Sequence, residues 1–136
     1  MAKGWKLESI RHSLAAKGVE TGRNHKYPPI ERTGAIIKGD VVYATPQQLA
    51  EYYSEAAPKI HTKDTLENFY AENTLATAMA IQKFGRSPYK VGRTDNSVTL
   101  ELKDEGNAEA EYIYMQKKYP NIKFALRGKT VIAKDG

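Results

Sequence analysis

Residues 98–103 read Val98-Thr99-Leu100-Glu101-Leu102-Lys103, so apolar and polar side chains alternate strictly. This period of two is typical of a β-strand with one face against a core and the other face in solvent. A turn-forming stretch at 94–97 precedes it, and the stretch 89–91 before that turn is rich in strand-forming residues. We therefore predict two strands joined by a turn in this part of the chain.

The alternation returns near the C-terminus. Apolar residues recur at every second position of 122–126, residues 127–129 (Arg-Gly-Lys) suit a turn, and residues 131–133 suit a returning strand. This pattern predicts a β-hairpin. The stretch 107–119 between the two strand pairs is typical of a helix, because it has two lysines in its last turn and Pro120 follows it.

Helical patterns dominate upstream of these strands. Thr45, Pro46 and Gln48 together form a capping-box signal with the proline that first turns favour, and Pro58 marks the end of this helix. Two short strands around a turn are expected just before it, at 35–44.

The longest predicted helix runs from Asp64, its expected N-cap, to Phe84, before Gly85 stops it. A shorter helix is expected at 5–17. Residues 19–33 fit neither the helical nor the strand period and contain two adjacent prolines, so we expect an irregular arm there.

Strands that cluster together, rather than alternating one by one with helices, indicate an α+β fold. We predict one small domain in which a mostly antiparallel sheet packs against about four helices, with a basic, irregular N-terminal arm. In this interpretation residues 1–33 form the basic helix and arm, and residues 34–136 form a single α+β domain. The length of 136 residues agrees with one domain.

The composition excludes several kinds of chemistry. The chain has no cysteine, which excludes disulfides, thiol nucleophiles and cysteine-based zinc sites. The histidines His12, His25 and His61 are too far apart for a metal-ligand motif, so we expect neither a metal nor a cofactor. No apolar run reaches the ~18 residues of a membrane span, so we expect a cytoplasmic protein without a membrane partner.

The positive charge is concentrated at the N-terminus. Residues 1–38 hold eight Lys or Arg and three Asp or Glu, whereas residues 39–136 hold 13 of each kind, so the first segment carries the whole net charge of +5. A basic segment ahead of a neutral body is typical of proteins that bind a polyanion. The alternative is that this excess charge only keeps the protein soluble.

Cations beside aromatic and histidine side chains favour nucleic-acid binding, because they combine phosphate contacts with stacking surfaces. The N-terminal region has this mixture, although we expect Trp5 itself to pack in the core. A second basic group surrounds the C-terminal hairpin. The predicted nucleic-acid-binding residues are Lys6, Arg11, Arg23, His25, Lys26, Arg32, Lys123, Arg127 and Lys129.

Asp95, Glu101 and Lys103 form a second candidate site. Their order, an acid followed by acid-x-lysine on a strand, resembles the arrangement of the PD-(D/E)xK nucleases. That resemblance implies metal-dependent cleavage of DNA, with a carboxylate holding the metal and the lysine steadying the developing charge. The alternative is the polar face of an ordinary antiparallel strand.

Residues 5–21 carry a second resemblance. Trp5, the pair Glu8-Ser9, the run 11–15 and Gly18 with Thr21 make this segment similar to an N-terminal segment of small uncharacterised archaeal proteins, several of them from plasmids, viruses or integrated elements. The resemblance implies an archaeal or mobile-element source and no mechanism.

Three functions therefore remain open. The leading hypothesis is a non-enzymatic protein that binds the phosphate backbone of DNA or RNA through its basic N-terminal region. The alternative is a structural or protein-interaction component of an archaeal virus or mobile element, which would include assembly with further copies of the chain. The third is a metal-dependent nuclease.

Overall fold

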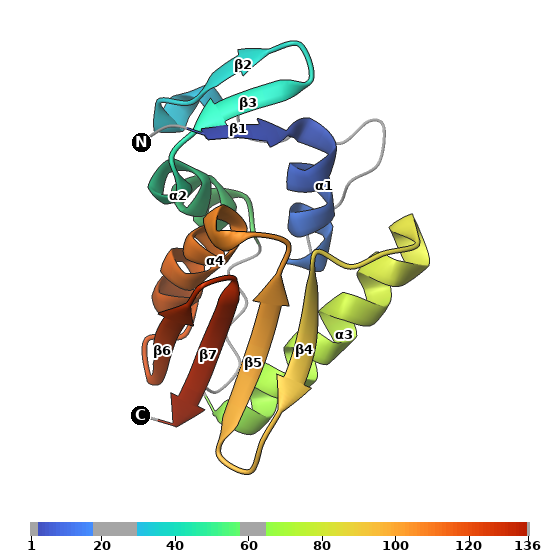
Figure 1. The fold of residues 1–136 in the computed structure, drawn as a ribbon, viewed down its shortest axis with the longest axis vertical. Coiled ribbons are helices and arrows are strands. Elements are labelled where there is room, and N and C mark those ends of the chain that lie inside the picture. Colours follow the sequence, from blue (N-terminus) through green and yellow to red (C-terminus); the bar gives the residue numbers. More distant parts are fainter. Residues whose placement is uncertain (1–2, 18–29, 58–64, 136) are drawn as a thin grey trace.

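The computed structural model describes residues 3–17, 30–57 and 65–135, and these form an α+β fold, as predicted (Figure 1). In chain order the elements are β1 (Lys3–Lys6), α1 (Leu7–Ala16), the 3-10 turn η1 (Ile30–Thr33), β2 (Ile36–Lys38), β3 (Val41–Ala44), α2 (Pro46–Ala56), α3 (Leu66–Phe84), β4 (Tyr89–Arg93), β5 (Ser97–Leu102), α4 (Glu105–Lys118), β6 (Ile122–Arg127) and β7 (Thr130–Asp135). Within the described ranges, no helix combines the length and apolarity needed to cross a lipid bilayer.

The larger sheet has four strands in the order β4-β5-β7-β6, and every neighbouring pair is antiparallel. The alternation in β5 has the predicted effect, because Val98, Leu100 and Leu102 are buried whereas Glu101 is exposed. Helices α3 and α4 lie on the same side of this sheet (Figure 1). None of the described helices covers its other side.

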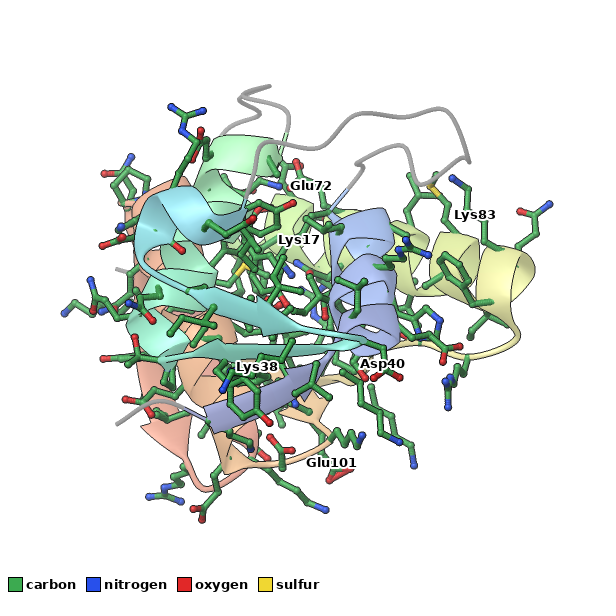
Figure 2. The ribbon with its side chains drawn as sticks, turned by 90° about the horizontal axis from the view of Figure 1, so that it is seen from above. Lys17, Lys38, Asp40, Glu72, Lys83 and Glu101 are labelled. Carbon is green, nitrogen blue, oxygen red and sulfur yellow. The ribbon has the colours of Figure 1, made fainter. Side chains whose placement is uncertain are left out.

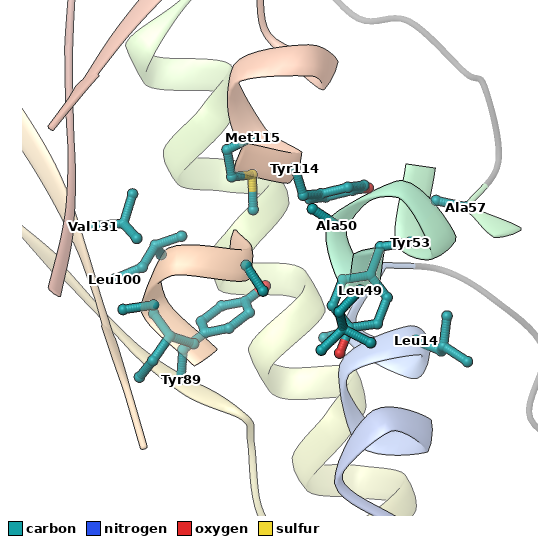
Figure 3. Close-up of a cluster of buried hydrophobic side chains, with 14 of the residues drawn as sticks. Leu14, Leu49, Ala50, Tyr53, Ala57, Tyr89, Leu100, Tyr114, Met115 and Val131 are labelled. Carbon is teal, nitrogen blue, oxygen red and sulfur yellow. The ribbon is translucent and has the colours of Figure 1, made fainter. Parts of the chain in front are cut away.

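Aromatic side chains join the helices to one another and to the sheet. Phe69 of α3 contacts Tyr119 and Phe124 edge-on, with ring centroids 5.0 and 5.5 Å apart. Tyr53 of α2 meets Tyr114 of α4 in the same geometry at 6.2 Å. Figure 3 shows these last two tyrosines within a buried cluster. Edge-on pairs at such distances stabilise the fold beyond the burial of their surface.

A second, three-stranded sheet in the order β1-β3-β2 contains the first described residues of the chain. The prediction of a helix from residue 5 is wrong at its start, because Trp5 lies in β1 and α1 begins at Leu7. Strand β1 pairs with β3, and Trp5 Nε1 donates a hydrogen bond to Ala44 O at 2.9 Å. The edge of β3 offers backbone partners that a longer helix would leave unpaired.

Residues 3–17 belong to the same hydrophobic core as the rest of the described chain, since Trp5, Ile10 and Leu14 are buried in it. The boundary predicted between residues 33 and 34 therefore does not separate two packed units. Most of the predicted irregular arm, 19–33, lies outside the described residues. Its last four residues form the turn η1.

The helix starts were predicted with mixed success. At α2 the capping box is present as predicted, because Thr45 Oγ1 accepts from Gln48 N at 3.1 Å and Gln48 Oε1 accepts from Thr45 N at 2.9 Å. Helix α3 has Thr65 as its N-cap, whereas the predicted cap, Asp64, lies outside the described residues. Helix α4 begins two residues earlier than predicted, because Asp104 caps it.

Candidate functional site

The outer face of the four-stranded sheet is the face turned away from α3 and α4. Every second residue of each strand contributes to it. These residues are Lys90, Gly92, Ser97, Thr99, Glu101, Lys123, Ala125, Arg127, Thr130, Ile132 and Lys134. Most of them are short or polar, which suits a face that meets solvent rather than a second layer of protein.

Four cations and one acid carry the charge of the outer face. Lys90, Lys123, Arg127 and Lys134 are exposed, and none of them forms an ion pair with a described residue. The acid is Glu101, the cross-strand partner of Lys90. The outer face therefore presents an excess of positive charge that no described acid neutralises.

The cations stand near the two ends of the strands. Lys123 and Lys134 face each other across β6 and β7. Arg127 lies four residues further along β6, about 13 Å away at about 3.3 Å per residue, in the same cross-strand row as Lys90. An uncharged row separates the two charged ends and consists of Gly92, Thr99, Ile132 and Ala125.

An open cleft of about 330 Å³ lies at the end of the sheet that carries Lys90. Its walls come from the start of α1, the connection between α3 and β4, the adjoining ends of β4 and β5, and the first turn of α4. Its cations are Lys6, Arg86, Lys90 and Lys103, and its acids are Glu8 and Glu101; Arg86 pairs with Glu8 at 3.6 Å, which leaves three cations and one acid. The cleft therefore continues the positive charge of the outer face toward the N-terminal part of the chain.

His12 forms part of the cleft wall. Its ring packs against Phe84 with centroids 4.3 Å apart, and its Nε2 lies 3.8 Å from Glu8 Oε1. Burial lowers the pKa of His12 below its ordinary value, and the charge of Arg86 lowers it further against the opposing effect of Glu8. His12 is therefore neutral near pH 7 and adds no positive charge to the cleft.

Three of the N-terminal cations are neutralised within the fold. Lys3 Nζ lies 3.3 Å from Asp104 Oδ2, and Arg32 pairs with Glu55 at 2.8 Å. Lys17 forms a buried ion pair with Glu111 (Figure 2 labels Lys17 in the interior). Half of the described cations in residues 1–38 are therefore paired, whereas Lys6, Arg11 and Lys38 are exposed and form no ion pair with a described residue.

The buried pair of Lys17 and Glu111 is enclosed by aromatic rings. Lys17 Nζ lies 4.4 Å from the ring centroid of Tyr53 and 4.9 Å from that of Tyr114. The side chains of the pair are only 2% and 3% exposed. Neither charge can therefore contact a ligand at the surface, and the pair has a structural role.

The structure brings only some of the predicted nucleic-acid-binding residues together. Lys6 lines the cleft, and Arg127 lies on the outer face. Lys129 adjoins the end of β5, because Leu102 N donates a hydrogen bond to Lys129 O at 2.8 Å. Lys123 stands at the opposite end of the same sheet.

The remaining predicted binding residues are not part of this surface or cannot be placed. Arg11 is exposed on α1 and does not line the cleft. Arg32 is paired with Glu55, as described above. Arg23, His25 and Lys26 lie outside the described residues.

The nuclease arrangement is not assembled. Glu101 and Lys103 line the same cleft, as their spacing predicts, but Asp95 lies in the turn at the far end of β5. Ser97 to Glu101 alone spans about 13 Å along β5, and Asp95 lies beyond Ser97 in the turn. Among the described residues, no group of three or more His, Asp or Glu side chains is placed to hold a metal ion.

Sequence reasoning missed three cations of this surface, which are Lys90, Lys134 and Arg86. The first two could have been found, since Lys90 stands between Tyr89 and Val91 in a predicted strand and Lys134 continues the alternation of the last strand. Arg86 reaches the cleft only through the packing of α1 against α3, which no local pattern signals.

Comparison with protein-family models, with curated proteins and with solved structures found no match for this chain. The similarity of residues 5–21 to archaeal segments therefore stays a prediction. A function has to be argued from the chemistry of the outer face and the cleft.

Proposed function

We propose that this protein binds nucleic acid through the outer face of its four-stranded sheet, by contacts to the phosphate backbone. The observation that carries the proposal is the set of four exposed cations, Lys90, Lys123, Arg127 and Lys134, without an ion-pair partner among the described residues. Neutralising phosphates with such cations releases counterions and gives affinity that does not depend on base sequence.

The proposed binding surface lies on strands β4 to β7, whereas the charge distribution of the sequence pointed to the N-terminal segment. Lys17 is buried with Glu111 and cannot reach a polyanion, and the exposed Lys3 and Arg32 already have carboxylate partners. Lys6 and Lys103 in the cleft extend the charged surface beyond the end of the sheet.

Duplex is favoured over single strands as the ligand. The outer face has no aromatic residue, so it lacks the rings on which unpaired bases stack. Its two charged ends are about 13 Å apart at the strand rise of about 3.3 Å. This spacing is close to the ~12 Å width of the major groove of B-DNA, so cations at the two ends can contact phosphates on both sides of one groove.

The test is the salt dependence of binding to a fluorescently labelled DNA duplex, measured by anisotropy. Four phosphate contacts predict a slope of about −3.6 in log affinity against log salt, so a fourfold rise in salt weakens binding about 150-fold. The same sequence as a single strand should bind more weakly. Absence of binding to either form at low salt would overturn the proposal.

A further inference from the structure

The cleft at the start of α1 keeps an excess of positive charge after its internal ion pair is counted. Arg86 and Glu8, 3.6 Å apart, offset each other. Glu101 is the remaining acid of the cleft wall. The remaining cations, all exposed and without an ion pair to a described residue, are Lys6, Lys90 and Lys103. Three positive charges and one negative charge leave the cleft with a net charge of +2.

The first turn of α1 supplies hydrogen-bond donors to the same cleft. The first N–H groups of a helix have no partner within the helix. Leu7 N donates to Asp40 O at 2.9 Å, but no side chain caps α1, so the N–H groups of Glu8 and Ser9 are left for another acceptor. Both residues line the cleft. Uncapped N–H groups at the positive end of a helix dipole favour an anion.

His12 adds a polar group to the wall of the cleft. Its side chain is only 8% exposed, and its ring forms no hydrogen bond with a described residue, because Nε2 lies 3.8 Å from Glu8 Oε1. A neutral imidazole carries one N–H donor. Since His12 lines the cleft, an oxygen of a bound ligand can accept a hydrogen bond from this N–H.

We propose that the cleft binds a phosphomonoester group. Such a group has a charge of about −1.5 to −2 near pH 7 and three acceptor oxygens, which complement the charge of +2 and the donors of the cleft. A phosphodiester carries a single negative charge and is less complementary. The volume of about 330 Å³ lies at the lower end of the range of ligand pockets, about 300–1,000 Å³, so part of the molecule that carries the phosphate also fits.

Two sources of a phosphomonoester suit this position. One is a small phosphorylated molecule that enters the cleft from solvent. The other is the terminal phosphate of a nucleic-acid strand, because the cleft adjoins the end of the outer face that carries Lys90. Binding of the phosphate depends on the cleft alone, whereas the second source rests on the proposed function of the outer face.

The first test is an NMR titration of the ¹⁵N-labelled protein near pH 8 with methyl phosphate, a dianion, and with dimethyl phosphate, a monoanion. Methyl phosphate should shift the amide signals of Glu8 and Ser9 until they saturate. Dimethyl phosphate should bind at least about tenfold more weakly, because it has lost one charge and one acceptor oxygen. The absence of a saturable shift with methyl phosphate, or equal affinity for the two compounds, would overturn the proposal.

Substitution of the cleft cations locates the site. Lys6→Gln and Lys103→Gln should each weaken methyl phosphate binding about three- to tenfold, because each removes one positive charge from the cleft. The matched control is Lys117→Gln, which removes an exposed cation at the other end of α4 and should leave the affinity unchanged. Equal affinities in the three variants would show that the phosphate binds elsewhere.

Competition distinguishes the two sources. If the ligand is the end of a strand, a DNA duplex with a 5′-phosphate should displace methyl phosphate and bind more tightly than the same duplex with a 5′-hydroxyl. Equal binding of the two duplexes would assign the cleft to a small phosphorylated molecule. Failure of both duplexes to bind at low salt would overturn the function proposed for the outer face, whereas the methyl phosphate titration would still report on the cleft.

Discussion

Lys17 contributes to the basic N-terminal segment in the sequence, but in the fold it lies in the core, paired with Glu111. Their ion pair is almost completely buried, and Glu111 Oε2 has no hydrogen-bond partner among the described residues. A buried carboxylate without a compensating charge is strongly unfavourable. The folded state therefore depends on keeping both partners or on removing both.

Lys17→Met should destabilise the fold by about 3–5 kcal/mol, because it leaves Glu111 charged and unpaired in the core. The double variant Lys17→Met/Glu111→Leu should recover most of this loss, since no isolated charge remains. Free energies of unfolding from urea titrations give the comparison. A double variant as unstable as Lys17→Met would contradict this account of the pair.

His12 makes the stability depend on pH. Burial and Arg86 lower its pKa in the folded state, so the unfolded chain binds more protons below about pH 6.5. The free energy of unfolding should therefore fall as the pH drops below 6.5, and this contribution should level off below the pKa of the folded state. In His12→Gln this part of the pH dependence should vanish. Equal pH profiles for both proteins would refute the assignment.

A substitution of Glu101 distinguishes two of the functions that the sequence leaves open, nucleic-acid binding and metal-dependent cleavage. Glu101 is the acid among the outer-face cations, so Glu101→Gln should strengthen duplex binding several-fold by removing repulsion from phosphate. The nuclease hypothesis predicts instead a magnesium-dependent cleavage that this variant loses. Anisotropy and a cleavage assay on the same preparations give both readouts. Weaker binding by Glu101→Gln would count against the proposed surface.

Elements whose signals are local were predictable from the sequence. The capping box at Thr45 and the alternation of β5 depend on residues within a few positions of each other, and both are present. Strand β1 was missed, because Trp5 is extended only when the edge of β3 lies beside it. That pairing joins residues nearly 40 positions apart. The spacing of Leu7, Ile10 and Leu14 favoured a helix but could not fix where it begins.

The residues of the candidate site also differ in how far the sequence alone could predict them. The cations of the C-terminal hairpin, Lys123 and Arg127, could be identified from the strand pattern, and the sheet places both on the outer face. The N-terminal cations could not be assigned, because the acids that neutralise Lys3 and Lys17 come from α4 and the residue before it. Net charge along the sequence does not reveal which charges are paired in the fold.

At the scale of the whole molecule, the N-terminal segment and the binding surface cannot be separated by truncation. Removing residues 1–33 would remove Trp5, Ile10 and Leu14 from the shared core. Loss of nucleic-acid binding after such a deletion would therefore report unfolding as readily as a lost contact. Substitutions of exposed cations test the surface without this ambiguity.

The most direct test compares two double variants with equal net charge by the salt dependence of duplex binding. Lys123→Gln/Lys134→Gln removes one charged end of the outer face, whereas Lys38→Gln/Lys117→Gln removes exposed cations elsewhere. We predict that the slope falls from about −3.6 to about −1.8 in the first variant and is unchanged in the second. Equal slopes in the two variants would contradict binding by the outer face.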